Sequence, residues 1–339
     1  MTRFGLWYDF RNPPAWRRSF ADVYASTFEQ IRQAEALGYD DIWTTEHHFI
    51  EDGYAPSLMA VCSAIAAQTS RVRIGTAVLL LPMHDPVRLA EDAATVDIIS
   101  DGRLDLGVGL GYRLGEFEAF GIDWRTRGRR MDEASTILRQ CWAPEAFSFA
   151  GRFYHYANVK VTPQPVQRPM PLLFGGLSAQ AVERAARLGT GFIAGAGADL
   201  IPLYLERCAA HGRLPGKLVR GLPFDAVADD PESAWSEIRE HVYYQRRMYV
   251  EWLNAAGTAV WPLPESADAI RASDPDIVVT PERAVRLIEE MLAEHPEITG
   301  FYWSPLLPGL KPATALRSIE RFARDVMPRF QLGGQVSSL

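Results

Sequence analysis

Segments with the periodicity of a strand alternate with segments of helical periodicity along nearly the whole chain. Short apolar runs predict strands at residues 3–8, 39–45, 71–81, 102–110, 171–176, 190–194, 218–228 and 298–303. Helical runs are expected at 19–37, 57–68, from Asp85-Pro86 on, around 131–141, and at 178–188, 199–211, 231–255, 280–294 and 311–326. Repeated strand–helix units force parallel strands with helices outside, and eight such units close into a barrel.

We therefore predict an α/β fold, a TIM (β/α)8 barrel with insertions, formed by a single domain over residues 1–330. A doubly wound open sheet is the alternative, but no Gly-x-Gly-x-x-Gly follows the first strand, where such a sheet would bind a dinucleotide. Residues 144–171 are rich in Pro, Tyr and Phe and suit a small hairpin insertion. The irregular stretch 257–279 is a candidate lid, and 331–339 is a tail.

Composition excludes some classes of partner. A net charge of −7 over 339 residues argues against nucleic acid, which needs a basic face. No apolar span of about 18 residues is present, and the N-terminus lacks the layout of a signal peptide, so we expect a cytoplasmic protein that does not enter a membrane. The three widely separated cysteines are expected in the core. The histidines lack ligand spacing, so no metal site is predicted.

The run Glu46-His47-His48 follows the predicted strand 39–45. Neighbouring side chains of a strand point to opposite faces, so we do not expect both histidines to bury in one core. Strand C-termini form the active face of such a barrel, and of the strand ends only this one offers a group that titrates near neutrality. Either His47 or His48 is the expected general acid or base, the other is structural, and Glu46 is the expected orienting carboxylate.

Glycines at two other strand ends indicate a flat or phosphorylated ligand. Gly107, Gly109 and Gly111 alternate at one strand end, where backbone can approach a ring system without Cβ atoms in the way. Gly175-Gly176 lead into a helix whose first N–H groups, with the Ser178 hydroxyl, make an anion cradle. Further positive charge follows the fourth strand, at Arg113, Arg125, Arg127, Arg129 and Arg130. Together these features predict a phosphorylated aromatic cofactor.

Several motifs in register resemble the bacterial luciferase-like monooxygenase family over nearly the whole chain. They are Trp43-x-x-Glu46-His47-His48-Phe49, the run 74–82 followed by His84-x-Pro86-Val87-Arg88-x-Ala90-Glu91-Asp92, Ser100-x-Gly102-Arg103, Phe120-Gly121 and Met327-Pro328. The resemblance implies a TIM-like barrel that binds reduced FMN or the deazaflavin coenzyme F-420, and it implies a homodimer.

The resemblance also implies roles for single residues. His47 takes the place of the catalytic histidine, and Ala77-Val78, directly after Thr76, falls where the family often has a non-proline cis peptide against the flavin ring. Ser178 matches a phosphate-contacting serine. Two positions depart from the light-emitting enzymes: Gly109-Leu110 replace a reactive cysteine and a phosphate-binding arginine. A second family arginine aligns near Gly128, so that Arg127 or Arg129 must serve instead.

These expectations lead to one preferred function and two alternatives. The preferred function is a two-component monooxygenase that uses reduced FMN, supplied by a flavin reductase, and dioxygen to oxidise a small apolar or aromatic substrate. Tyr112, Trp43, Phe10 and Trp7 are candidate walls of its pocket. The first alternative is an F-420-dependent hydride-transfer oxidoreductase. The second is a non-catalytic flavin-binding or partner subunit.

Overall fold

The computed structural model describes residues 2–195, 199–257 and 260–331 of the chain. The strands of its main sheet are β1 (Arg3–Tyr8), β2 (Asp41–Thr44), β3 (Arg73–Thr76), β4 (Leu79–Leu80), β5 (Leu104–Gly109), β8 (Leu172–Gly175), β9 (Gly191–Ala194), β10 (Lys217–Gly221) and β13 (Gly300–Trp303). Hydrogen-bonded neighbours follow the order β3-β2-β1-β13-β10-β9-β8-β5-β4, and β3 also pairs with β5. The sheet is thus the closed parallel barrel, surrounded by helices, that the alternation predicts.

Residue contacts divide the chain into two compact units. The first unit holds the residues up to Trp43, Ile50–Tyr54 and the chain from Leu218 on. The second unit holds Thr44–Phe49 and Ala55–Lys217.

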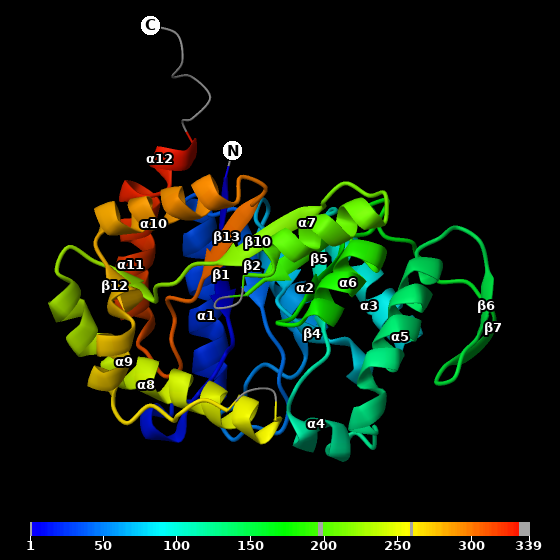
Figure 1. Cartoon of the computed structure of the whole chain (residues 1–339), viewed down its shortest axis with the longest axis horizontal. Coiled ribbons are helices and arrows are strands. Elements are labelled where there is room, and N and C mark those ends of the chain that lie inside the picture. Colours follow the sequence, from blue (N-terminus) through cyan, green and yellow to red (C-terminus); the bar gives the residue numbers. More distant parts are fainter. Residues whose placement is uncertain (1, 196–198, 258–259, 332–339) are drawn as a thin grey trace, which may run out of the picture. The chain divides into compact units, whose positions relative to one another are not determined.

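In the first unit, helices pack against strands that come from the two ends of the chain. Its further elements are α1 (Phe20–Ala36), β11 (Ala226–Val227), α8 (Pro231–Ala255), α9 (Ala267–Ser273), β12 (Val278–Val279), α10 (Pro281–Glu294), α11 (Pro312–Asp325) and α12 (Pro328–Gln331). Phe4 of β1 meets Phe301 of β13 and Phe322 of α11, with ring centroids 6.2 and 5.3 Å away. Within this unit α8 lies beyond the carboxyl end of β1 (Figure 1).

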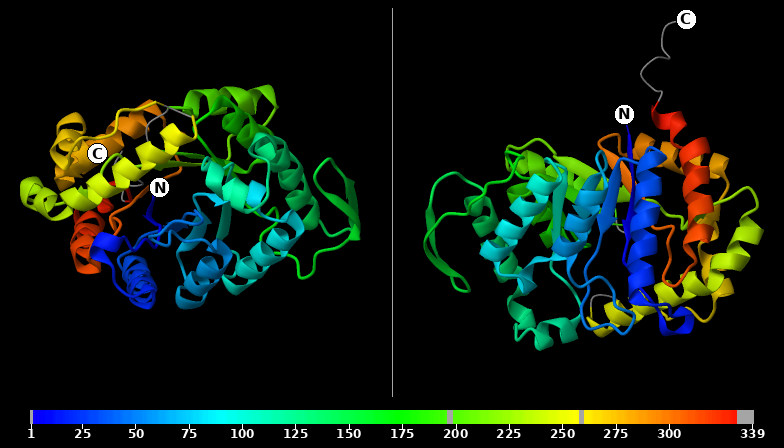
Figure 2. Two further views of the ribbon diagram at one scale, coloured as in Figure 1. Left: turned by 90° about the horizontal axis from the view of Figure 1, so that it is seen from below. Right: turned by 180° about the vertical axis from the view of Figure 1, so that it is seen from behind.

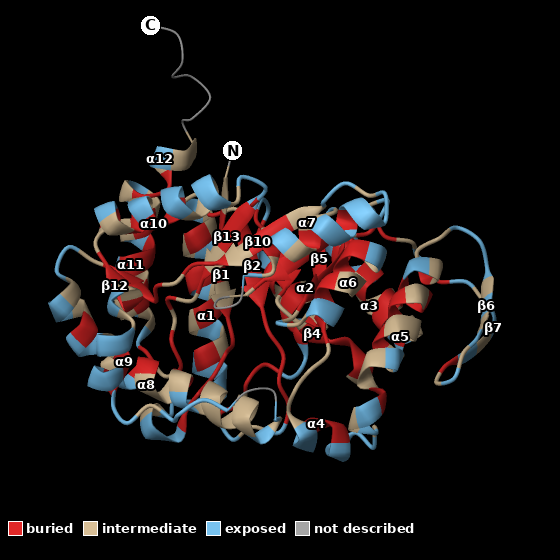
Figure 3. Ribbon diagram, in the orientation of Figure 1, coloured by how far each residue is buried: buried red, intermediate tan, exposed pale blue. Residues whose placement is uncertain are grey.

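The second unit has its own buried core of strands. Its further elements are α2 (Leu58–Gln68), α3 (Pro86–Ile99), α4 (Leu114–Ala119), α5 (Arg127–Cys141), β6 (Phe147–Ala150), β7 (His155–Val159), α6 (Ala179–Leu188) and α7 (Ile201–Ala210). Every residue of β5, β8 and β9 is buried (Figure 3). The antiparallel pair β6–β7 lies within the segment expected as an insertion and stands away from the strands, beyond α5 (Figure 2).

Helix starts follow from local chemistry. The Asp85 side chain accepts hydrogen bonds from the N–H groups of Val87 and Arg88, with Pro86 in the first turn of α3. Thr280 and Pro281 begin α10 in the same way. A capping side chain followed by proline satisfies exposed N–H groups and presets the backbone, which explains why these helix starts could be predicted.

The structure corrects the bounds of two predicted strands. The run 71–81 is broken after Thr76, and Leu81–Met83 form a short 3-10 helix that contains Pro82. The run 218–228 is divided into β10 and β11, with Pro223 between them. Proline has no N–H for a strand ladder, which explains why β4 ends before Pro82 and β10 before Pro223. The break after Thr76 coincides with the cis peptide Ala77–Val78.

The candidate lid 257–279 is not a structureless stretch. It contains α9, a 3-10 helix at Pro275–Ile277 and β12, which pairs with β11. Ala267, Ile270, Ile277 and Val278 belong to a buried cluster with Trp235 and Ile238 of α8. Apolar packing therefore orders most of this segment, whereas residues 258–259 and the expected tail from 332 on lie outside the described residues.

Cys62, Cys141 and Cys208 are buried and form no disulfide, as expected of core residues. In the described part of the chain, no helix combines the length and the apolar character that a membrane crossing requires.

Gly107 of β5 gives a direct test of this packing. A Cβ at this position would lie 1.9 Å from the Thr76 carbonyl oxygen and 2.6 Å from Ile193 Cδ1. Because the backbone of β3 cannot move away cheaply, Gly107→Ala is expected to lower the free energy of unfolding by about 2 kcal/mol or more, measured by urea denaturation. Gly115→Ala is the matched control, since a Cβ there meets nothing within 4 Å. A Gly107→Ala protein as stable as the control would contradict this packing.

Candidate active site

The segments after β2, β3 and β5 meet within the second unit. The Thr44 carbonyl accepts a hydrogen bond from Ala77 N at 2.6 Å, and Glu46 N donates to the Val78 carbonyl at 3.3 Å. Backbone hydrogen bonds thus fix the run 44–46 beside the end of β3, although β2 itself ends at Thr44. The two histidines that follow are held on this anchored backbone.

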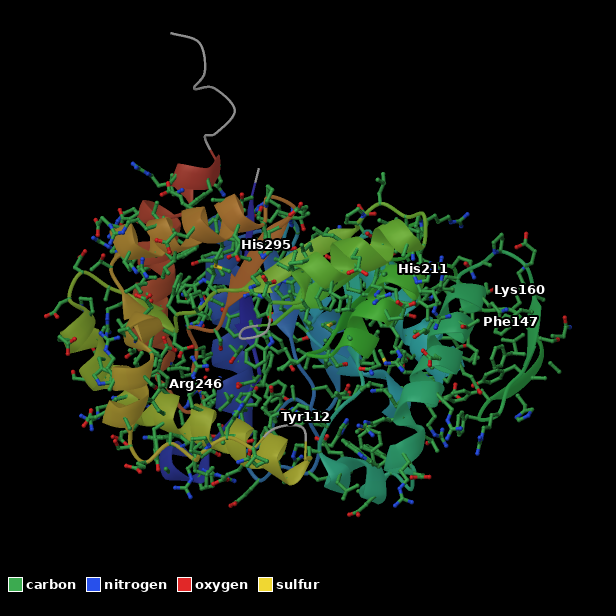
Figure 4. All side chains as sticks on the ribbon, in the orientation of Figure 1. Tyr112, Phe147, Lys160, His211, Arg246 and His295 are labelled. Carbon is green, nitrogen blue, oxygen red and sulfur yellow. The ribbon has the colours of Figure 1, made fainter. Side chains whose placement is uncertain are left out.

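His47 has a protein partner at each ring nitrogen. Its Nδ1 lies 2.9 Å from Glu116 Oε1, and its Nε2 lies 3.1 Å from the Tyr112 hydroxyl. Glu116 belongs to α4, and Tyr112 lies in the loop between β5 and α4 (Figure 4). The His47 side chain is only 5 % exposed, so its orientation is set by these two partners.

Glu116 is the hub of this group. Its Oε1 also accepts hydrogen bonds from His48 N at 2.8 Å and from Arg113 Nη1 at 3.0 Å. Burial by itself would raise the pKa of Glu116, but the hydrogen bonds and the positive charge of its partners outweigh burial and hold the pKa below its ordinary value. Glu116 is therefore a carboxylate near neutral pH. Its Oε2 is buried and has no hydrogen-bond partner among the described residues.

The electrostatics of His47 favour a neutral ring. Burial lowers the pKa of His47, and the bond to Glu116 offsets this only in part, so the pKa lies below its usual 6.5. A neutral imidazole that gives its N–H to a carboxylate presents the other nitrogen as a base, which is the arrangement needed for proton transfer near neutrality.

His48 belongs to a second buried carboxylate. Glu46 Oε1 lies 2.9 Å from His48 Nε2 and 2.8 Å from His84 Nε2, and Glu46 Oε2 accepts from Leu80 N at 2.5 Å. Burial would raise the pKa of Glu46, but the charge of His84 and the hydrogen bonds of both rings lower it to about 2. Glu46 is thus a buried anion that ties together the segments after β2 and β4.

One expectation about this run was wrong. Both histidines are buried, because β2 ends before them and each ring is bonded to a buried carboxylate. Glu46, the expected orienting carboxylate, bonds His48, and the carboxylate bonded to His47 is Glu116. Sequence reasoning missed Glu116. Its available signal was an Arg-x-x-Glu pair, Arg113 and Glu116, directly after the glycine-rich strand end.

The predicted glycines meet around Val78. The Ala77–Val78 peptide is cis, as the family resemblance implies. A Cβ at Gly109 would lie 2.4 Å from Val78 Cγ2, and a Cβ at Gly175 would lie 2.6 Å from Val78 Cγ1. These two glycines therefore leave space for the Val78 side chain. A bound ligand would meet Val78 before it met either glycine. Gly111, with φ +75°, and Gly176, with φ +152°, adopt conformations that favour glycine.

The expected phosphate residues lie at the starts of two helices. The Ser178 hydroxyl accepts from Ala181 N at 3.3 Å and caps α6. Arg127 begins α5, where its guanidinium lies 3.5 Å from the centre of the Trp124 ring. Burial and the charge of Arg184 lower the pKa of Arg127, and its buried Nε has no partner among the described residues. Arg184 itself is paired with Asp132. Arg127 therefore has, among the described residues, an unused charged donor, and the start of α6 has free helix N–H groups, which are the two kinds of group that bind phosphate.

Two candidate pocket walls are core residues of the first unit. Phe10 is 3 % exposed and packs against Tyr24 and Phe28 of α1, with ring centroids 4.8 and 5.6 Å away. Trp43 is 1 % exposed, and its ring lies 6.3 Å from that of Tyr302. Large aromatic side chains near strand ends suit packing as well as ligand binding, which is why sequence could not separate the two roles.

Comparisons with known proteins agree with this geometry. The chain is 33 % identical over 224 residues to the F420-dependent glucose-6-phosphate dehydrogenase of Kineococcus radiotolerans, covering 61 % of this chain and 65 % of that protein. It is 33 % identical over 151 residues to the oxygenase component of the flavin-dependent trigonelline monooxygenase of Acinetobacter baylyi, covering 44 % of this chain and 42 % of that protein. The match thus spans less than two thirds of either relative.

The fold agrees with that of monooxygenase RslO1 from Streptomyces bottropensis, with a TM-score of 0.85 at 24 % identity over 97 % of this chain and 100 % of that one. The family model described as luciferase-like monooxygenase matches residues 2–276. The chain therefore belongs to the luciferase-like monooxygenase family.

Proposed function

We propose that the chain is a flavin-dependent monooxygenase that uses reduced FMN and dioxygen to oxidise a small apolar or aromatic organic molecule. The observation that carries the proposal is the buried His47, kept neutral by its surroundings and oriented by the ionised Glu116. Similarity to the oxygenase component of a flavin-dependent monooxygenase supports this choice of reaction. A separate flavin reductase would supply the reduced flavin, and we expect a cytoplasmic homodimer.

Residues of the second unit fit the cofactor. Arg127, whose buried Nε has no partner in the described part of the chain, and the start of α6 at Ser178 would hold the phosphate. Val78, between Gly109 and Gly175, would face the ring system, and the unpartnered Glu116 Oε2 is a buried acceptor for a ring N–H. Reduced FMN, when bound, supplies the electrons that activate dioxygen.

The protein would manage protons and exclude water. His47 would accept a proton at Nε2, and the resulting imidazolium would be stabilised by Glu116 at 2.9 Å from Nδ1. Because both residues are almost fully buried, this charge pair forms where water screens it little. The buried hydrogen bonds of Glu46 hold the supporting backbone in place.

An F-420-dependent hydride transfer is the second candidate. It is favoured by the longer match to F420-dependent glucose-6-phosphate dehydrogenase. A neutral histidine beside a carboxylate also suits removal of a hydroxyl proton while a hydride leaves the same carbon. The two candidates differ in the cofactor and in the need for dioxygen.

Cofactor binding separates the candidates. We expect FMN to bind more tightly than F-420, and oxidation of the substrate with reduced FMN to require dioxygen. Arg127→Met is expected to weaken FMN binding about 10- to 100-fold, because a charge-assisted hydrogen bond to phosphate is lost; fluorescence quenching gives the dissociation constants.

Arg139→Met is the matched control, with the same charge change on an exposed residue of the same helix. It should stay within about twofold of the unchanged protein. Tighter binding of F-420, with substrate oxidation that proceeds without dioxygen, would contradict the monooxygenase and favour the hydride-transfer enzyme.

Replacement of His47 tests its role as the acid–base group. His47→Gln is expected to lower kcat about 10²- to 10⁴-fold, the usual contribution of a general acid–base group, while His155→Gln, on the exposed hairpin, leaves kcat unchanged. Since the base must be neutral and its pKa lies below 6.5, activity should be lost only as the pH falls through this lowered value. Steady-state rates across pH measure it. Unchanged turnover in His47→Gln would favour a non-catalytic subunit.

A further inference from the structure

A small pocket of the first unit is lined by the end of β1, by α1 and by the loop that follows β13. Its cavity volume is about 10 Å³, which holds one particle of about the size of a water molecule. The loop contributes Leu307 and Leu310, and α1 contributes Val23 and Thr27. Among the described lining residues Arg18 alone is exposed, so small solutes reach the pocket on the side of this arginine.

Three side chains of the pocket each have a buried polar atom without a hydrogen-bond partner among the described residues. These atoms are the Tyr8 hydroxyl oxygen, Asp9 Oδ2 and Arg11 Nη1. The three residues are 1, 3 and 4 % exposed, so bulk water does not solvate them. A buried polar group that makes no hydrogen bond is unfavourable, and three of them on one pocket indicate a ligand that would satisfy them together.

Arg11 is held in place by its other two nitrogens. Its Nε donates to Asp52 Oδ2 at 2.7 Å, and its Nη2 donates to Met248 Sδ at 2.6 Å. The Asp52 carboxylate therefore balances the charge of Arg11 on the Nε side, and it is not among the described lining residues. The Nη1 group of Arg11 remains as a positively charged donor for the pocket.

Asp9 and Tyr8 are also hydrogen-bond donors. Burial and the charge of Asp52 raise the pKa of Asp9 to about 7, against the opposing effect of Arg11. Asp9 Oδ1 accepts a hydrogen bond from Arg11 N at 3.2 Å, so the proton of the neutral acid lies on Oδ2. Burial also raises the pKa of Tyr8, and its hydroxyl keeps its proton. The pocket thus combines three donors.

We propose that this pocket is a binding site for a small monovalent anion of the size of chloride. The anion accepts hydrogen bonds from the Tyr8 hydroxyl, from Asp9 Oδ2 and from Arg11 Nη1, which gives each of these buried groups a partner. All these residues belong to the first unit. The site goes beyond the proposed function and does not depend on it.

The charges around the pocket select this class of ligand. Asp52 balances Arg11 through their ion pair. The guanidinium nitrogens of Arg18 lie 3.5 Å from Ser26 Oγ, which is uncharged, so the positive charge of Arg18 is in excess while Asp9 is neutral. One monovalent anion makes this group of charges neutral, which favours its burial. A cation would meet two guanidinium groups, and a phosphate or an organic anion is larger than the cavity.

Binding of the anion is linked to the proton on Asp9. An ionised Asp9 would repel the anion and would offer no donor, so the affinity is constant below the pKa of about 7 and falls as the pH rises through it. The other groups around Asp9 keep their charge in this range. Both arginines of the pocket stay protonated, Asp52 is held in its ion pair, and burial raises the pKa values of Tyr8 and of Tyr249 of α8.

Chlorine-35 NMR of the full chain, titrated with sodium chloride in a chloride-free buffer, tests the site. Tyr8→Phe removes one donor and keeps the ring, so it is expected to weaken chloride binding about tenfold. Tyr24→Phe, on α1 and outside the described lining, is the matched control and should stay within about twofold. No saturable line broadening in the unchanged protein, or an unchanged affinity in Tyr8→Phe, would overturn the proposal.

The same titration separates this pocket from the phosphate residues of the second unit. Chloride binding that disappears in Arg127→Met and persists in Tyr8→Phe would place the anion at those residues and would overturn the proposal. Because the measurement needs neither FMN nor dioxygen, its failure leaves the proposed function unaffected.

Asp9→Asn tests the proton linkage with little change of shape. The amide keeps an oxygen for the Arg11 N–H and supplies an N–H donor that does not titrate. The chloride affinity of the unchanged protein is expected to fall about tenfold or more between about pH 6 and about pH 9, whereas that of Asp9→Asn stays constant. An affinity of the unchanged protein that does not fall with pH, or an equal fall in Asp9→Asn, would overturn the role of Asp9 as a ligand and with it the proposal.

Anomalous diffraction from crystals grown with sodium bromide locates the anion directly. A bromide in contact with the Tyr8 hydroxyl and Arg11 Nη1 is the expected result. Bromide bound at other places, with none in this pocket, would overturn the proposal.

Discussion

The hydrogen bonds of one buried carboxylate, Glu116, organise the chemistry of this protein. A carboxylate removed from water is costly unless several donors replace its hydration. Here a ring nitrogen, a backbone N–H and a guanidinium all meet the same oxygen. Because this oxygen is saturated with donors, the charge state of Glu116, the orientation of His47 and the direction of its hydrogen bonds are fixed together. The other oxygen remains unsatisfied among the described residues, where a ligand can use it.

Other buried charges of the second unit hold the scaffold. Glu46 joins the segments after β2 and β4 through two histidines and a backbone N–H. Asp105, near the start of β5, binds Arg73 at 2.7 Å and Lys217 at 2.6 Å. Removing one partner of such a group leaves an uncompensated buried charge, at a cost of about 3–5 kcal/mol. The Arg73 pair joins the neighbouring strands β3 and β5, and the Lys217 pair joins β5 to β10, which is not its neighbour. These ion pairs therefore tie strands of the barrel together, while apolar burial drives folding.

Periodicity and helix caps predicted most of the architecture, because these signals act within a few residues. The barrel, the helix starts at Asp85 and Thr280 and the exposed hairpin follow from local pattern. The regular structure of the lid segment could not be predicted in this way. It depends on the packing of Ile270 and Ile277 against Trp235, which is distant in the sequence. Pro223 was visible, but the division of its apolar run into two strands was not predicted.

In the candidate site too, local features were predicted and contacts between distant residues were not. The importance of the run at His47 was readable, and the resemblance indicated the cis peptide at Ala77–Val78. The choice between Glu46 and Glu116 as the partner of His47 depends on where α4 folds back, 69 residues further along the chain. The glycines at 109 and 175 pointed to a close approach, but the first neighbour is Val78, a contact that only the folded chain defines.

The ionised state of Glu116 can be measured directly by infrared difference spectroscopy. The spectrum of the unchanged protein near neutral pH is compared with that of Glu116→Gln, under conditions in which both are folded. An ionised Glu116 predicts that the variant loses the stretching bands of a carboxylate. Loss of the carbonyl band of a protonated carboxylic acid instead would show that Glu116 is neutral, and would contradict both the orientation of the His47 proton and its role as a base.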